Sequence, residues 1–190
     1  MTSATSTTGT DSRPLPLFIE LELLAGTLYG IFAEKYPEHR EFWEAISGEE
    51  QHHADILRGL GEKMETGEVL FVGGKTRASA LKTFIDYLKQ TIARSRKENF
   101  PMAKALSIAL DIEKSVLEKN ALDHFHGDSP EVADTLEKLK SETVDHARRI
   151  ETAAGSRNRN SRLAGPARPV HGVEESPSNS AVHSIRITMV

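Results

Sequence analysis

The sequence predicts an all-α protein, and three observations lead to this fold class. Apolar residues recur at the spacing of a helix face in five separate runs of the chain. Proline and glycine separate these runs, in positions typical of helix ends. A β-strand pattern is confined to one short segment, VLFV at residues 69–72. The 190 residues, 38% of them apolar and 27% charged, are enough for one globular domain.

The first two predicted helices lie on either side of a proline. The first begins after Pro14 and Pro16 and ends near Tyr36, because the residue before Pro37 is disfavoured in the helical conformation. The second begins after Pro37 and continues to about Met64. A glycine-containing loop, GEVLFVGGKTR, follows this pair of helices.

A third helix is predicted after this loop. Thr76 or Ser79 can cap its beginning, and its apolar period continues to about Asn99. It lies between two pairs of helices in the sequence. We therefore expect the third helix to belong to a crossover segment that joins the two pairs.

The second pair consists of the fourth and fifth predicted helices. Pro101 suits the first turn of the fourth helix, which is expected to end near Phe125. Asp128 or Ser129 can cap the fifth helix, which is expected to run to about Ala153. Together the five helices predict a helical domain over residues 15–153.

The two ends of the chain are expected to be disordered. Residues 1–14, MTSATSTTGTDSRP, contain too few apolar side chains to form a core. Residues 154–190 are mostly rich in Ser, Asn, Gly, Pro and Arg and have no period. The last ten residues, AVHSIRITMV, are more apolar. They are a loose end, a short strand or a segment that docks on a partner in a larger assembly.

Composition excludes several classes of function. The chain has no cysteine, so a metal must be bound by carboxylates and imidazoles, of which 28 Asp and Glu and 8 His are available. A net charge of −4 and a pI near 6.1 argue against nucleic acid as a partner. A mean hydropathy of −0.41 and the lack of a long uninterrupted apolar window argue against a membrane span. No signal-peptide pattern is found near Met1, so a cytoplasmic protein is expected.

Four of the predicted helices place ionisable residues on their apolar faces. A helix turns by about 100° per residue, which allows each face to be worked out from the spacing. The residues on these faces are Glu22 in the first helix, Glu50 and His53 in the second, Glu113 in the fourth and His146 in the fifth. Any one of them alone could be a hydrogen-bonded core residue. An unpaired buried charge costs several kcal/mol, and no Lys or Arg shares these faces, so the set indicates a bound metal cation.

The arrangement of these residues repeats along the chain. In the first pair of helices Glu22 precedes Glu50 by 28 residues and His53 by 31. In the second pair Glu113 precedes His146 by 33 residues. The two pairs therefore look like halves related by a pseudo-twofold axis. A Glu and a His three residues apart lie side by side on a helix, and such sets are typical of carboxylate-bridged dinuclear sites in four-helix bundles.

These residues make the chain resemble the rubrerythrin branch of the ferritin-like superfamily. The resemblance covers about residues 17–152 and lies in three segments, FIELELLAGTLYGIFAEKYPEHREFWEAISGEEQHHADIL, ALSIALDIEKSVLE and LKSETVDHARRI. It implies a ferritin-like four-helix bundle with an additional crossover helix between helices two and three of the bundle. It also implies two iron ions, or manganese, with Glu22 and Glu113 as terminal ligands, Glu50 as a bridge, and His53 and His146 as one imidazole for each ion.

The sequence departs from the family pattern at three points. Thr143 stands where a second bridging Glu is expected, and Val116 stands where rubrerythrins carry a further Glu. The lack of cysteine removes the rubredoxin-type centre. Glu142, four residues before His146, is a candidate replacement ligand, with a solvated flank residue as the alternative.

The resemblance implies a ferroxidase or peroxidase that oxidises Fe(II) with O₂ or H₂O₂, and a homodimer is common in the superfamily. Tyr29 is expected either to hydrogen-bond a ligand or deliver an electron, or to be a core residue. The alternative function is a degenerate ferritin-like bundle that binds one metal ion or none. Such a bundle would have a structural, stress-response or partner-docking role.

Overall fold

The computed structural model describes residues 14–71, 75–118, 122 and 125–163, with side chains except for 75–77, 116–118 and 157–163. The elements of the described chain are α1 (Leu15–Lys35), the 3-10 turn η1 (Pro37–His39), α2 (Arg40–Glu65), β1 (Leu70–Phe71), α3 (Lys75–Lys97), α4 (Met102–Glu118), β2 (Phe125–His126) and α5 (Pro130–Leu163). The prediction of an all-α protein is confirmed, because helices form most of the described residues.

Prolines determine where α1 ends and α2 begins. Pro14 precedes α1 and Pro16 lies in its first turn, where a missing N–H removes no helical hydrogen bond. Tyr36 leaves the helical conformation, with φ −121° and ψ 75°, because it precedes Pro37. The turn η1 then redirects the chain into α2, so that the two helices pack against each other.

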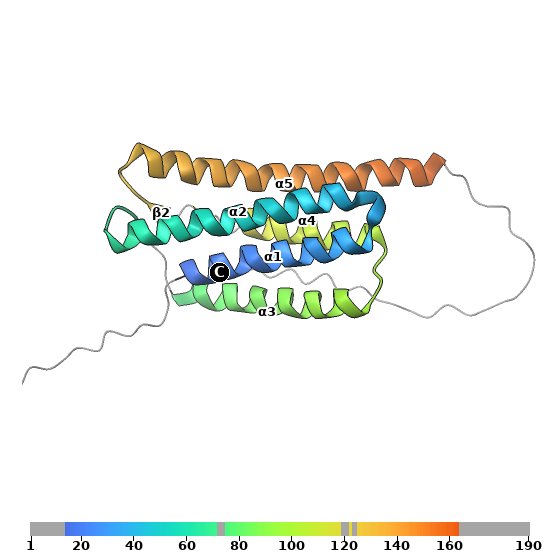
Figure 1. Cartoon of the computed structure of the whole chain (residues 1–190), viewed down its shortest axis with the longest axis horizontal. Coiled ribbons are helices and arrows are strands. Elements are labelled where there is room, and N and C mark those ends of the chain that lie inside the picture. Colours follow the sequence, from blue (N-terminus) through green and yellow to red (C-terminus); the bar gives the residue numbers. More distant parts are fainter. Residues whose placement is uncertain (1–13, 72–74, 119–121, 123–124, 164–190) are drawn as a thin grey trace, which may run out of the picture.

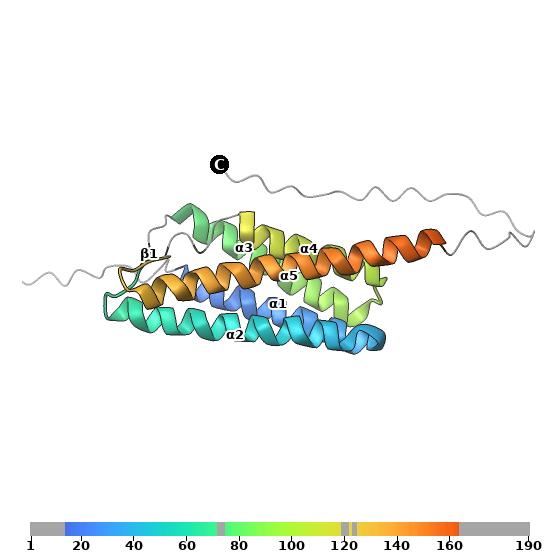
Figure 2. The ribbon, with the colours of Figure 1, turned by 90° about the horizontal axis from the view of Figure 1, so that it is seen from above.

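The five helices lie side by side along the long axis of the molecule (Figure 1). α1 packs against α2, α3 and α4, and α5 packs against α4 and α2. Figure 2, seen from above, shows α2 and α3 at opposite edges of this array. The core lies between the helices, and its largest fully buried side chains are Trp43, Tyr29, Phe32, Leu21, Leu28, Ile46, Leu57, Leu88, Leu106, Ile112, Leu139 and Ile150.

The predicted end of the fourth helix near Phe125 is wrong. The described part of α4 ends at Glu118, and Phe125 lies in β2, paired with Phe71 of β1 in a two-stranded antiparallel sheet. The two rings pack edge to face with their centroids 5.0 Å apart. This contact connects segments distant in sequence, so helical periodicity could not reveal it. The strand signal in VLFV is confirmed at its two central residues.

The predicted end of the fifth helix is also wrong. α5 continues beyond Ala153 to Leu163, so the expected tail 154–190 is helical in its first ten residues. Between Gly155 and Gly165 the sequence contains no Gly or Pro, and this is consistent with the extension. The expected disorder of 1–13 and 164–190, and the docking segment within the C-terminal tail, lie outside the described residues.

The expectation that no segment is apolar enough to span a membrane is corrected at α1. By length and composition it is apolar enough to cross a membrane, with a mean hydropathy of 1.5 over its most apolar window. Half of that window is buried inside this fold, and the helix packs on three others. In this structure α1 is a core helix, and its apolar surface is used for contacts with its neighbours.

Candidate metal centre

Four helices bring the five ionisable residues of the apolar faces into one buried cluster. Their exposed fractions are 8% for Glu22, 2% for Glu50, 1% for His53, 3% for Glu113 and 1% for His146. The helical spacing predicted this burial correctly for all five. The cluster lies where α1, α2, α4 and α5 face one another, and none of its five residues belongs to α3.

A close approach of α1 and α2 positions Glu50. A Cβ atom on Gly26 would lie 3.1 Å from the backbone oxygen of Ser47 and 3.3 Å from the Cβ of Glu50. The Ser47 hydroxyl donates a hydrogen bond of 2.8 Å to the carbonyl of Gly26. The lack of a side chain at Gly26 therefore lets α2 lie close enough to α1 for the Glu50 carboxylate to reach the space between the helices.

Glu50 lies between the two imidazoles. Its Oε1 is 2.8 Å from Nδ1 of His146, and its Oε2 is 3.4 Å from Nδ1 of His53. The imidazole rings stack with their centroids 5.0 Å apart. One potential ligand atom from each of these three residues lies within 4.8 Å of the others. Nδ1 of His146 is also 3.8 Å from Oε2 of Glu113, so the same nitrogen faces two carboxylates.

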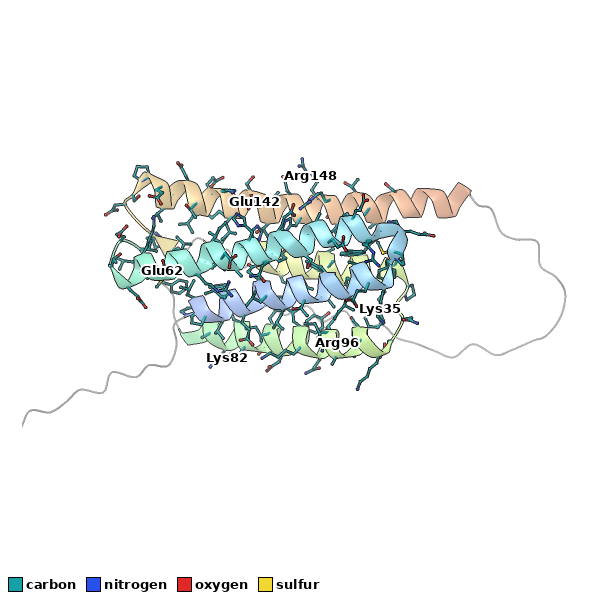
Figure 3. The ribbon with its side chains drawn as sticks, viewed as in Figure 1. Lys35, Glu62, Lys82, Arg96, Glu142 and Arg148 are labelled. Atoms are coloured by element: carbon teal, nitrogen blue, oxygen red, sulfur yellow. The ribbon has the colours of Figure 1, made fainter. Side chains whose placement is uncertain are left out.

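The outer nitrogen of each imidazole faces a different carboxylate. Nε2 of His53 is hydrogen-bonded to Oε2 of Glu142 at 3.1 Å. Nε2 of His146 lies 2.8 Å from Oε2 of Glu49. Glu142 was a candidate ligand, and the structure does bring it to the cluster, on the far side of the His53 ring from Glu50. Figure 3 shows Glu142 on the side of α5 that faces α2, whereas Arg148 points away from the other helices.

Sequence reasoning missed Glu49 and its partner Arg149. Both guanidinium Nη atoms of Arg149 contact the Glu49 carboxylate, one of them at 3.2 Å. The expectation that no Lys or Arg balances the charge of the cluster is therefore wrong for Glu49, which lies at the edge of the cluster. Arg149 contacts Glu49 and not the buried Glu50. A signal for Glu49 was present, because it precedes His53 by four residues as Glu142 precedes His146.

Burial and the charges of neighbouring groups shift the pKa values of the carboxyl groups in the cluster. Burial, followed by the charge of Glu50, raises the pKa of Glu22 and of Glu113 well above the ordinary range. Burial also acts to raise the pKa of Glu50, but contacts with His146 and His53 outweigh it and hold this pKa below its usual value. In the metal-free cluster, negative charge is therefore favoured on Glu50 and disfavoured on Glu22 and Glu113.

The pKa of His53 is raised although burial acts in the opposite direction. The hydrogen bonds and charges of Glu50 and Glu142 cause this rise, because both favour the imidazolium form. The positive charge of the imidazolium form is therefore favoured beside Glu50 in the metal-free cluster. A divalent cation bound between these groups would take over that role.

Tyr29 is tied directly to the cluster. It is fully buried, and its hydroxyl donates a hydrogen bond of 2.6 Å to Oε1 of Glu113. Burial and the charges of Glu113 and Glu50 raise its pKa, so the phenol remains a donor. Its ring lies 5.7 Å from that of Trp43. Tyr29 therefore hydrogen-bonds Glu113, a residue that the sequence predicts to be a ligand, and delivery of an electron stays a prediction.

Thr143 does not replace the expected second bridging Glu. It is buried, but its hydroxyl donates a hydrogen bond of 2.9 Å to the carbonyl of Leu139 in the same helix. Its oxygen is thus engaged with the backbone of α5. The cluster has a single central carboxylate, that of Glu50, among the described residues.

The cluster fits a divalent transition-metal ion. Oε1 of Glu50 and both ring nitrogens of His146 are buried, yet within the described chain none has a hydrogen-bond partner of acceptable geometry. Such atoms are rare in folded proteins unless a bound water or ion satisfies them. Imidazole and carboxylate donors suit iron, manganese or zinc. Glu50, His53 and His146 would hold the ion, with Glu22 and Glu113 as further carboxylates.

Comparisons with known proteins give no independent indication of function. No family model, curated protein or solved structure matches this chain.

Proposed function

We propose that this chain is a ferritin-like iron protein that oxidises Fe(II) with O₂ or H₂O₂ at a buried di-metal centre. The observation that carries the proposal is Glu50, buried between two imidazoles whose Nδ1 atoms both face it, with His146 lacking well-directed hydrogen bonds. Such a group is costly without a cation, because buried polar atoms lose their contacts with water.

The proposed architecture is a four-helix bundle of α1, α2, α4 and α5, with α3 as the crossover helix. The packing of α1 on α2 and of α4 on α5 supports two helix pairs, and α3 separates them in sequence. α3 packs on α1 and supplies no residue to the cluster. This arrangement matches the repeated pattern of Glu and His in the two pairs.

The residues of the cluster would each contribute to such a reaction. When bound, iron supplies the electrons: H₂O₂ takes one electron from each of two Fe(II) ions and two protons, and leaves as two molecules of water. Glu50 would link the two halves of the centre, because its two oxygens face different imidazoles. Glu22 and Glu113 would lose their protons and neutralise the added positive charge. Tyr29 would hold Glu113 in place through its hydrogen bond.

A specific observation favours a second candidate function, a degenerate bundle that binds one ion or none. Thr143 uses its hydroxyl within α5, so the second bridging carboxylate of a complete centre is missing. Within the described chain, one group of three ligands converges, formed by Glu50, His53 and His146. One ion at this group would leave the chain with a structural or binding role.

Metal stoichiometry separates the two candidates. The purified chain is loaded with Fe(II) without oxygen, and bound iron is measured before the sample is exposed to H₂O₂ and its Fe(III) absorption followed. About two ions per chain and rapid oxidation would support the first candidate. One ion without oxidation would support the second, and no bound metal would refute a metal centre.

A pair of variants tests whether the metal binds at the cluster. Glu50→Ala should abolish iron binding, because it removes the carboxylate shared by both imidazoles. Glu62→Ala is the matched control, since Glu62 is an exposed residue of the same helix. Loss of binding in both variants, or in neither, would contradict the assignment.

A further inference from the structure

Two partly exposed carboxylates flank the buried cluster on its outer side. We call Glu49 and Glu142 the bracing carboxylates. Their side chains are 43% and 34% exposed, whereas the imidazoles that they contact are 1% exposed. Each lies next to Nε2, the nitrogen that points away from Glu50. They are therefore placed to act on the imidazoles and not on the centre itself.

The bracing carboxylates act across the interface between α2 and α5. Glu49 of α2 contacts His146 of α5, and Glu142 of α5 contacts His53 of α2. Each precedes the His of its own helix by four residues, so the exchange is reciprocal. This spacing of four residues between Glu and His occurs in both halves of the repeat, whereas Thr143 breaks the Glu-x-x-His pattern of the second half. A reciprocal contact of this kind fixes the register of α2 against α5 at the level of the cluster.

A cation on the outer side balances each bracing carboxylate. Arg149 contacts both oxygens of Glu49, and Nζ of Lys138 lies 3.8 Å from Oε1 of Glu142. Each half of the site therefore has the order cation, carboxylate, imidazole and Glu50. The negative charge added by the bracing carboxylates is offset at the surface, and the centre does not have to neutralise it.

The two ring nitrogens of each imidazole compete for one proton when the ring is neutral. Glu50 lies near Nδ1 of both rings and favours a proton there, whereas a bracing carboxylate favours a proton on Nε2. A proton on Nδ1 blocks coordination by that atom. A proton on Nε2 leaves the Nδ1 lone pair directed at Glu50 and free to bind a metal ion.

We propose that Glu49 and Glu142 are positioning residues that hold the proton on Nε2 of the imidazole of the opposite helix. Glu142 already makes this hydrogen bond with His53. Oε2 of Glu49 lies 2.8 Å from Nε2 of His146, within hydrogen-bond distance but without the angle of a hydrogen bond. The part of this inference that concerns metal affinity rests on the proposed function. Glu142 is thereby assigned to orientation of His53 and not to ligation.

Nitrogen NMR of the metal-free protein tests the proton positions directly. The full chain, labelled with ¹⁵N at histidine, is measured over a series of rising pH values until the imidazole ¹⁵N shifts no longer change. We expect the wild type to carry its protons on Nε2 of His53 and His146. Glu142→Ala should move the proton of His53 alone to Nδ1, and Glu49→Ala that of His146 alone. An unchanged proton position, or a change in the imidazole of the same helix, would overturn the inference.

Conservative variants separate positioning from a loss of folding. Glu49→Gln and Glu142→Gln keep an acceptor oxygen and should retain the wild-type proton positions. Glu62→Ala and Glu137→Ala are controls on the same two helices, since both side chains are exposed. A shift of the His53 or His146 proton in these controls equal to that in the Ala variants would also contradict the inference.

Mn(II) affinity, measured by electron paramagnetic resonance, forms the second arm. The two Ala variants should raise the Kd for Mn(II) by about 10–100-fold, and the Gln variants by much less. Failure of the wild type to bind Mn(II) or Fe(II) would refute the proposed function. The NMR result would then still decide whether the bracing carboxylates set the proton positions.

Discussion

A single methyl group at Gly26 should disturb both the packing of α1 on α2 and the metal centre. In an exposed helical position, Gly→Ala stabilises a helix by up to about 1 kcal/mol. At Gly26 the added Cβ would meet the backbone oxygen of Ser47 at 3.1 Å and the Cβ of Glu50 at 3.3 Å. Both neighbours belong to α2 and cannot rotate away, so α2 has to shift by a few tenths of an ångström.

The expected size of the effect follows from these two opposing contributions. Overpacking of a close interface typically costs about 1–3 kcal/mol, which exceeds the gain in helix propensity. Gly26→Ala should therefore lower the free energy of unfolding by up to about 2 kcal/mol. Gly48→Ala is the matched control, since Gly48 lies in α2 and a Cβ added there would meet no atom within 4 Å. It should raise the melting temperature by about 2–4 °C, the shift expected for 1 kcal/mol at this chain length.

Thermal unfolding and Mn(II) titration of the two variants provide the assay. Because Glu50 is one of the neighbours displaced, Gly26→Ala should also weaken Mn(II) binding, whereas Gly48→Ala should leave the Kd unchanged. If Gly26→Ala stabilised the fold as much as Gly48→Ala and bound Mn(II) with the wild-type Kd, the contact at Gly26 would not limit how closely α1 and α2 pack.

Three further predictions concern the cluster and the core. Tyr29→Phe removes the hydrogen bond to Glu113 and should lower the free energy of unfolding by about 1–3 kcal/mol in chemical denaturation; no loss would contradict a role for this bond. The pKa of Glu22 is raised in the folded protein, so its contribution to the stability of the metal-free fold is full at low pH and is lost as the pH rises through that pKa. Metal binding at Glu22 has to displace the proton that this carboxyl group holds below its pKa. Mn(II) affinity measured by titration calorimetry should therefore increase with pH, by about tenfold per pH unit for each proton displaced, and Glu22→Gln should reduce this slope by one proton; an equal slope in both proteins would count against displacement. Phe125→Ala should cost about 3–5 kcal/mol in thermal unfolding, because Phe125 is buried against Phe71, and a loss below about 1 kcal/mol would show that this contact is unimportant.

The buried residues of the centre could be predicted because helical periodicity is a local property. Once Leu21, Leu28 and Phe32 define a buried face, the position of Glu22 relative to it follows from the angle per residue. The same reasoning placed Glu50 and His53 correctly. The apolar period does not predict which carboxylate contacts which imidazole nitrogen, because that depends on the packing and register of two helices.

The residues that periodicity missed lie at the edges of helix faces. Glu49 is partly exposed, and its spacing of four residues from His53 does not show that it contacts His146 and Arg149 in the folded chain. The end of α4 was misjudged for a related reason, since Phe125 is used for a strand contact with Phe71. In both cases the partner comes from a distant part of the sequence.

The sequence by itself determined that this protein is helical, where its prolines separate the first helices, and which acidic and imidazole groups are buried. Each of these follows from the conformational preferences and the apolar period of a short segment. Only the tertiary structure decided that Glu50 lies between both imidazoles and that Glu49 and Glu142 cross over to the opposite helix. Those contacts depend on the separation and register of helices, which are set by side-chain packing such as the close approach at Gly26.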